Sequence, residues 1–148
     1  MKAKNQITVE KLNQLLADYQ IHYQNLRGLH WNIKGQLFFA LHARFEEYYN
    51  QAAEVVDEIA ERILMLGGQP LHTFEDYTKT AQLGVVANVS EAKPAVESVL
   101  ESQRYFLKSF NEILEVAGEN NDEGTAAMMS DWIGHTEKEI WMLESFLA

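Results

Sequence analysis

The chain has 148 residues, of which 47% are hydrophobic and 23% charged, as expected for a soluble single domain with a sizeable core. It contains no cysteine, which excludes disulfides, thiolate metal sites and cysteine nucleophiles. Its formal net charge of −10 argues against a general nucleic-acid binder and favours a protein that attracts cations. The sequence shows no secretion signal and no apolar run long enough for a membrane span, so we expect a cytoplasmic protein.

Four long segments show the periodicity of amphipathic helices. They cover about residues 8–34, 38–66, 91–117 and 122–147. A short helix is expected within residues 71–82, inside the long connection between the second and third helices, and residues 84–89 are expected to be a connector. This order predicts an all-α, four-helix bundle with a long crossover, the ferritin-like arrangement, in a single domain over residues 1–148 with a short tail at residues 1–7.

The second predicted helix has three faces, whereas a bundle helix normally needs two. With an advance of about 100° per residue, the apolar face that should meet the core contains Phe45, Tyr48, Ala52, Ile59, Ile63 and Leu66. A solvated face should contain Arg44, Glu47, Gln51, Glu58 and Arg62. Between them lies a third stripe, called the contact stripe below: His42, Glu46, Tyr49, Asn50, Ala53, Asp57 and Glu61. Its mixture of histidine, acids and small or aromatic residues indicates a surface that contacts another chain.

The contact stripe predicts a metal site shared between two subunits. His42 and Asp57 lie about 22 Å apart along the helix, too far to hold one ion within a chain. If two copies of the helix cross antiparallel near Ala53, the His42 end of one meets the Asp57 and Glu61 end of the other. His30, at the end of the first helix, can reach the same place. Two imidazoles and two carboxylates suit Fe(II), with Zn(II), Mn(II) and Co(II) as competitors.

Each of these residues taken alone also fits an ordinary structural role. A single histidine near an apolar helix face is more often a packed core residue than a ligand, and Trp31 would normally be a core or interface anchor. Asp57 and Glu61 could be solvated surface acids. No histidine has a glutamate three residues before it, so the Glu-x-x-His pair of an iron site inside the bundle is absent. We interpret the remaining histidines as structural because no acidic partner was found for them: His22, His72 and His135.

The stretch LHWNIKGQLFFALHARFEEYY (residues 29–49), continuing to Asp57 and the Glu61-Arg62 pair, resembles the signature of Dps proteins, the miniferritins. The resemblance extends over nearly the whole chain, including GGQP at residues 67–70 and KEIWML at residues 138–143. The positions of His30, His42, Asp57 and Glu61 match the ferroxidase ligands of that family.

The resemblance implies a hollow shell of 12 subunits, built from two-fold dimers, that oxidises Fe(II), preferably with hydrogen peroxide, and stores ferric mineral. Iron is then substrate and cargo, and no organic cofactor is expected. By the same resemblance Glu46 assists a second, weaker iron position, and Trp31 intercepts oxidising equivalents beside the site. Asp122 and Asp131 match acidic positions of the family's three-fold iron-entry pores, although for Asp122 alone an ordinary place at a helix start is the better interpretation.

The chain also departs from the family pattern at three places. Glu46 stands where aspartate is common, so a longer side chain must reach the second iron, and Ala127 stands where a pore acid is often found. The tail before Thr8 has two lysines, whereas DNA binding in the family often depends on a longer basic tail. We therefore expect weak or absent DNA binding. A structural particle that coats DNA, with the metal site secondary, is the alternative hypothesis.

Overall fold

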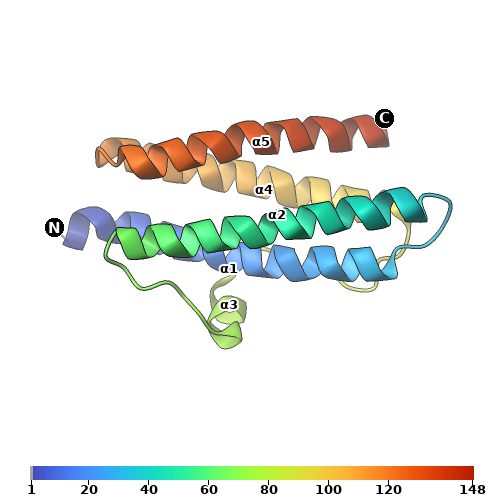
Figure 1. Ribbon diagram of the computed structural model, residues 1–148, viewed down its shortest axis with the longest axis horizontal. Coiled ribbons are helices and arrows are strands. Elements are labelled where there is room, and N and C mark those ends of the chain that lie inside the picture. The colour runs from blue at the N-terminus through green and yellow to red at the C-terminus, as the bar shows by residue number, and fades with distance from the viewer. Residues whose placement is uncertain (1) are drawn as a thin grey trace.

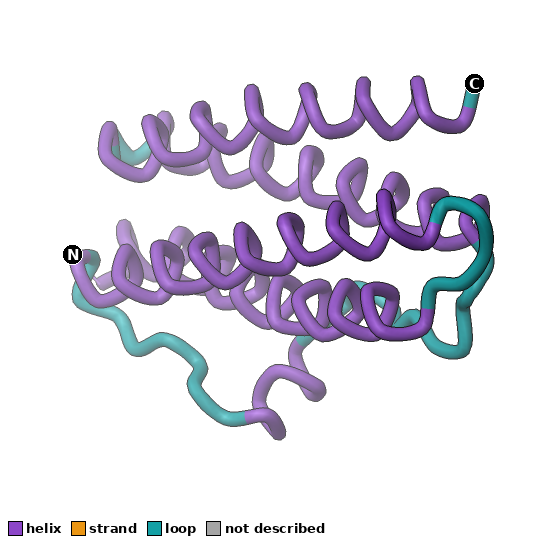
Figure 2. The backbone as a smooth tube through the Cα atoms, turned by 45° about the vertical axis from the view of Figure 1, so that its right-hand side comes forward, coloured by secondary structure: helices purple, strands orange, loops and turns teal. Residues whose placement is uncertain are grey.

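The computed structural model describes residues 2–148, with their side chains from Asn5 onward. These residues form five helices and no strand (Figures 1 and 2). The helices are α1 (Lys2–Asn32), α2 (Phe38–Met65), α3 (Phe74–Thr80), α4 (Ala92–Glu119) and α5 (Glu123–Leu147). Among these residues, no helix combines the length and the apolar character needed to cross a membrane.

Two antiparallel helix pairs, α1 with α2 and α4 with α5, lie against each other to make the bundle (Figure 1). The connection between α2 and α4 returns along the length of the bundle and carries α3 on its way (Figure 2). As a result, α2 and α4 run in the same direction. The predicted all-α four-helix bundle, with a short helix in its long connection, is confirmed.

Two predicted helix ends differ from the structure. Residues 2–7, which we expected to form a tail, continue α1 because they contain neither glycine nor proline to stop it. Gly118 does not end α4, which extends to Glu119. The left-handed backbone that closes this helix belongs to Asn121, with a φ of 57°, and the amide of Asp122 donates to the Ala117 carbonyl at 2.8 Å.

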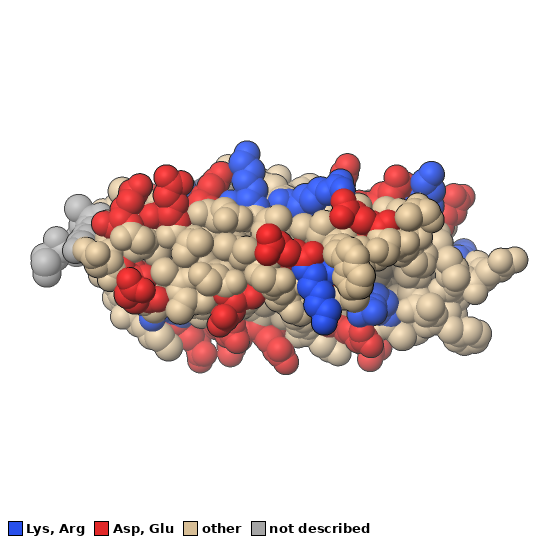
Figure 3. All heavy atoms as spheres, turned by 90° about the horizontal axis from the view of Figure 1, so that it is seen from above, with Lys and Arg blue, Asp and Glu red and all other residues tan. Residues whose placement is uncertain are grey.

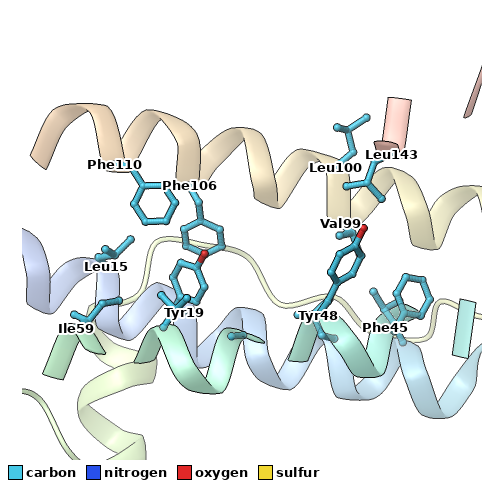
Figure 4. Close-up of a cluster of buried hydrophobic side chains, with 14 of the residues drawn as sticks. Leu15, Tyr19, Phe45, Tyr48, Ile59, Val99, Leu100, Phe106, Phe110 and Leu143 are labelled. Carbon is cyan, nitrogen blue, oxygen red and sulfur yellow. The ribbon is translucent and has the colours of Figure 1, made fainter. Parts of the chain in front are cut away.

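The predicted core face of α2 packs inward as expected, with Leu66 half-buried and the other five members buried. Opposite it, Tyr19 lies against Phe106 with ring centroids 4.1 Å apart, and Phe110 continues the aromatic cluster (Figure 4). Truncating a large side chain in such a core typically costs about 2–5 kcal/mol, so this cluster is a main source of bundle stability.

Polar side chains of α1 hold the long connection against the bundle. The Asn13 amide bonds to the backbone of Gln69 and Leu71. One turn and a half further along, the Asp18 carboxylate accepts hydrogen bonds from the amides of Gln82 and Leu83 at 2.7 and 2.9 Å. Asn25 binds the backbone of Gly84 and Val86 in the same way. The connection therefore runs parallel to α1 in a register that these three side chains define.

Candidate metal centre

His30 and His42 come together at the tight turn that joins α1 to α2. His30 lies in the last turn of α1 and His42 in the second turn of α2. Gly35 supports the turn between them with a φ of 108°, a value that residues with a side chain rarely adopt. The two imidazole rings stack with centroids 3.8 Å apart and planes 12° from parallel. The structure therefore brings together the two histidines that the sequence singled out.

Reciprocal hydrogen bonds fix both rings. Nδ1 of His30 lies 2.6 Å from the carbonyl oxygen of His42, and Nδ1 of His42 lies 2.8 Å from the carbonyl oxygen of His30. A carbonyl oxygen can only accept, so each Nδ1 must carry the proton. In a neutral imidazole the other nitrogen, Nε2, then keeps its lone pair. A ring held by Nδ1–H on a carbonyl, with Nε2 unprotonated, is the arrangement typical of metal-binding histidine.

Neighbouring side chains hold the histidine pair in place. Phe38 stacks on His42 at a centroid distance of 4.8 Å, and Tyr49 meets His30 edge-on at 5.3 Å. A carboxylate oxygen of Glu46 lies 3.7 Å from Nε2 of His30, and its side chain is half exposed. His30 itself is only 6% exposed, so its position has little freedom. The cluster of His30, His42 and Glu46 therefore brings together three of the five predicted ligands.

The predicted carboxylate ligands lie elsewhere on the same chain. Asp57 and Glu61 are exposed on the contact stripe of α2, about four helical turns beyond His42. Within the described part of one chain, no three histidine, aspartate or glutamate side chains are grouped closely enough to hold a metal ion. The structure thus keeps the imidazoles and the two acids apart within the subunit.

Trp31 follows His30 directly and is 56% exposed in the single chain, so it is not a core residue. The guanidinium of Arg27 lies over its ring, 4.8 Å from the centroid, and also 5.4 Å from the centroid of Tyr23. A large aromatic side chain held by a cation on the surface suits either an interface anchor or a redox-active neighbour of the candidate metal centre.

Asp122 has a structural role at the start of α5. As the N-cap, it accepts hydrogen bonds from the backbone amide and hydroxyl of Thr125, and Arg62 binds it at 2.7 Å. Burial raises the pKa of this carboxyl, but the hydrogen bonds from Thr125 and Arg62 outweigh burial and lower it overall. Our assignment of Arg62 to the solvated face was wrong, because it spans from α2 to α5. Asp131 is exposed on α5, about two turns beyond Thr125.

One group of polar residues was missed from the sequence. Nε2 of His135 lies 3.4 Å from a carboxylate oxygen of Glu139, four residues later on α5, and meets the side-chain amide of Gln51 on α2. The interpretation of His135 as a histidine without an acidic partner was therefore wrong. The His-x-x-x-Glu spacing, which puts both residues on one side of a helix, was the available signal. No comparable sequence pattern marks Gln51, because helical periodicity places it on the solvated face of α2.

Comparisons with known proteins agree with this architecture. Residues 9–148 match the ferritin-like domain family. A DNA protection during starvation protein of Porphyromonas gingivalis is 41% identical over 93% of this chain and 87% of its own length. A Dps crystal structure from Vibrio cholerae O1, described as a member of the ferritin-like diiron-carboxylate superfamily, superposes with a TM-score of 0.97 at 43% identity, covering 99% of this chain and 92% of that one. A Dps protein from Bacillus brevis gives 0.97 at 33% identity, covering 100% and 99%.

The reciprocal hydrogen bonds make a prediction about proton positions in the metal-free protein. Neutron diffraction from deuterium-exchanged crystals, grown above neutral pH, should show deuterium on Nδ1 of both His30 and His42 and none on Nε2. The reason is that the facing carbonyl oxygens accept and cannot donate. Deuterium on Nε2 of either ring would show that this nitrogen is not available as a ligand.

Proposed function

Since this chain belongs to the Dps proteins of the ferritin-like family, we propose that it is a miniferritin that oxidises Fe(II), preferably with hydrogen peroxide, at sites shared between subunits. In this proposal the ferric product is stored inside a hollow shell of 12 subunits, and the removal of iron and peroxide protects the cell from oxidative damage. The observation that carries it is the histidine pair, in which a backbone carbonyl engages each Nδ1 and Nε2 is left as the ligand atom of each ring.

The shared site follows from two separate groups of predicted ligands on one chain. His30, His42 and Glu46 lie at one end of the contact stripe, and Asp57 and Glu61 lie about 22 Å away along α2. An antiparallel pairing of two α2 helices about a two-fold axis near Ala53 would join each half to the complementary half of the partner. Two imidazoles and two carboxylates then bind Fe(II), and Glu46 reaches toward a second iron.

The chemistry proposed for this site is a two-electron reduction of peroxide by two Fe(II) ions. Each iron gives one electron, and peroxide takes both, together with two protons, to become two water molecules. Pairing the electrons in this way avoids the one-electron reduction that forms hydroxyl radical. Trp31, exposed beside His30, is placed to intercept any oxidising equivalent that escapes the site.

Iron entry is proposed along acidic residues at the start of α5. Asp122 is already bound to Arg62 and Thr125, so part of its charge is neutralised within the chain. Asp131 is exposed and remains the better candidate for attracting Fe(II). Both residues remain in the proposed entry route. Asp122 stabilises the start of α5, and Asp131 attracts the cations.

The alternative, a particle that acts by coating DNA, has less support. A 12-subunit shell of chains with a net charge of −10 each would carry a charge on the order of −120, which repels duplex phosphate. On the face seen in Figure 3, acidic side chains lie along most of the length, and basic side chains lie mainly over its middle and right. DNA protection by a relative is compatible with iron and peroxide removal, which needs no contact with DNA.

The proposed function can be tested through radical chemistry. The protein should bind roughly two Fe(II) per shared site and oxidise them faster with peroxide than with dioxygen. In Fe(II)/peroxide mixtures, spin trapping should show a hydroxyl-radical signal that falls as protein is added. The Asp57→Ala, Glu61→Ala double variant is the matched control and should leave the signal high. An undiminished signal at saturating wild-type protein would contradict the proposed protective role.

The shared site can be tested by mixing two inactive variants. One variant lacks both imidazoles (His30→Ala, His42→Ala) and the other lacks both carboxylates (Asp57→Ala, Glu61→Ala). Each should assemble yet lose rapid Fe(II) oxidation. Co-expressed with different tags, they form mixed dimers in which one of the two sites is intact, so random pairing should restore about a quarter of wild-type activity.

A site contained within one chain could not be rescued by this mixture, since every chain is defective. Mixed particles that contain both tags, yet are no more active than their parents, would rule out the antiparallel shared site. Dimer composition is checked by mass spectrometry of the tagged chains before activity is measured.

Duplex DNA should bind to this protein weakly or not at all. A gel-shift assay at about 50 mM salt, with divalent metal left out, gives electrostatic binding its best chance. We expect no retarded complex at micromolar protein, because the shell and DNA are both strongly negative. Compact retarded complexes under these conditions would instead support the DNA-coating alternative.

A further inference from the structure

All four long helices contribute to a small cavity in the interior of the bundle. Tyr19 and His22 border it from α1, Gln103 from α4 and Thr136 from α5, and side chains of α2 complete its wall. These four polar residues are between 3% and 6% exposed. Buried polar groups in proteins are nearly always hydrogen-bonded, either to protein or to ordered water. The cavity wall therefore raises the question of what its polar groups bind.

His22 is the member of this group that most needs a ligand. Burial lowers the pKa of its imidazole to about 3, and no hydrogen bond within the described part of the chain contributes to that shift. The closest rings are aromatic, with the centroid of Phe106 at 5.0 Å and that of Tyr19 at 5.6 Å. Packing against such rings does not satisfy a neutral imidazole, which has one nitrogen that donates and one that accepts.

Gln103 lies at the same level of the bundle as His22. The helices α1 and α4 run in opposite directions (Figure 1), and Tyr19 packs on Phe106 with ring centroids 4.1 Å apart. One turn along α1 leads from Tyr19 to His22, and one turn back along α4 leads from Phe106 to Gln103. Both side chains border the cavity, so an imidazole and an amide face one space from two helices.

The size and charge of the cavity suit one small neutral molecule. Its volume is about 20 Å³, and one ordered water needs at least about 10–15 Å³. The lowered pKa keeps the His22 imidazole uncharged, and the amide and hydroxyl groups of the wall carry no charge. Other polar groups of the wall are already paired, because the Tyr48 hydroxyl bonds to Glu139 and the Gln51 amide meets His135. A water molecule, which both donates and accepts, fits such a wall better than an ion does.

We propose that this cavity is a binding site for a single water molecule, held by His22, Gln103 and Thr136. The imidazole, the amide and the hydroxyl each offer a donor and an acceptor, and about three hydrogen bonds are usual for a buried water. The water joins α1, α4 and α5 in the interior of the subunit, where it satisfies polar groups that the core would otherwise leave unpaired. The site is a structural element of the subunit and is separate from the proposed ferroxidase site.

A high-resolution crystal structure of the intact protein tests the site directly. It should show one peak of electron density in the cavity, about 2.7–3.2 Å from a ring nitrogen of His22 and from the side-chain polar atoms of Gln103 and Thr136. A cavity without density would overturn the proposal. So would a direct contact between His22 and Gln103 that closes the space between them.

Paired substitutions give a second test, read as the shift in the thermal unfolding midpoint. His22→Leu and Gln103→Leu should each lower the midpoint, and the double variant should lower it by clearly less than the sum, because both remove partners of one water. His72→Leu is the matched control, since His72 is exposed on the connection, and its shift should add to that of Gln103→Leu. Additive shifts for His22 and Gln103 would overturn the proposal, and the wild-type crystal structure decides alone where a variant fails to fold.

Discussion

The hydrogen bonds that tie the long connection to α1 are the constraint on which the rest of the structure depends. Asp18 is 1% exposed, and its carboxylate accepts from the amides of Gln82 and Leu83 and from the hydroxyl of Tyr105 on α4. One buried charge therefore joins α1, the connection and α4, and it is tolerated because several donors satisfy it. With the connection returned along the bundle in this register, α4 must start beside the turn between α1 and α2, where the amide of Lys34 donates to the Ser90 carbonyl.

The path of the connection also decides which surfaces stay open. Its helix α3 packs against α1, and the acids of the contact stripe on α2 remain exposed. In the part of the chain that the structure describes, the face of α2 between the histidine pair and the acids is exposed at Glu46, Asn50 and Ala53. This arrangement is what the proposed two-fold pairing of subunits needs, because in that proposal each chain supplies histidines to one site and acids to the other.

Two polar groups of the structure are held by different physical means. His30 and His42 are oriented by backbone carbonyls, so folding alone sets their geometry. Glu139 is buried between helices, 3.4 Å from Nε2 of His135 on the same helix. The first group lies at the turn between α1 and α2, whereas the second lies within the bundle, between α2 and α5.

The sequence by itself determined the five helices, the buried face of α2 and the pair His30 and His42, because helical periodicity and turn residues are local signals. Only the tertiary structure decided which side chains contact each other across the bundle. Arg62 and Gln51 belong to the solvated face by periodicity, yet Arg62 reaches Asp122 and Gln51 reaches His135 on α5. Periodicity tells which side of a helix a residue occupies, but the axial register between α2 and α5 depends on the packing of all four helices and on the length of the connection. No local sequence pattern encodes that register, which is what places Gln51 beside His135 and Glu139.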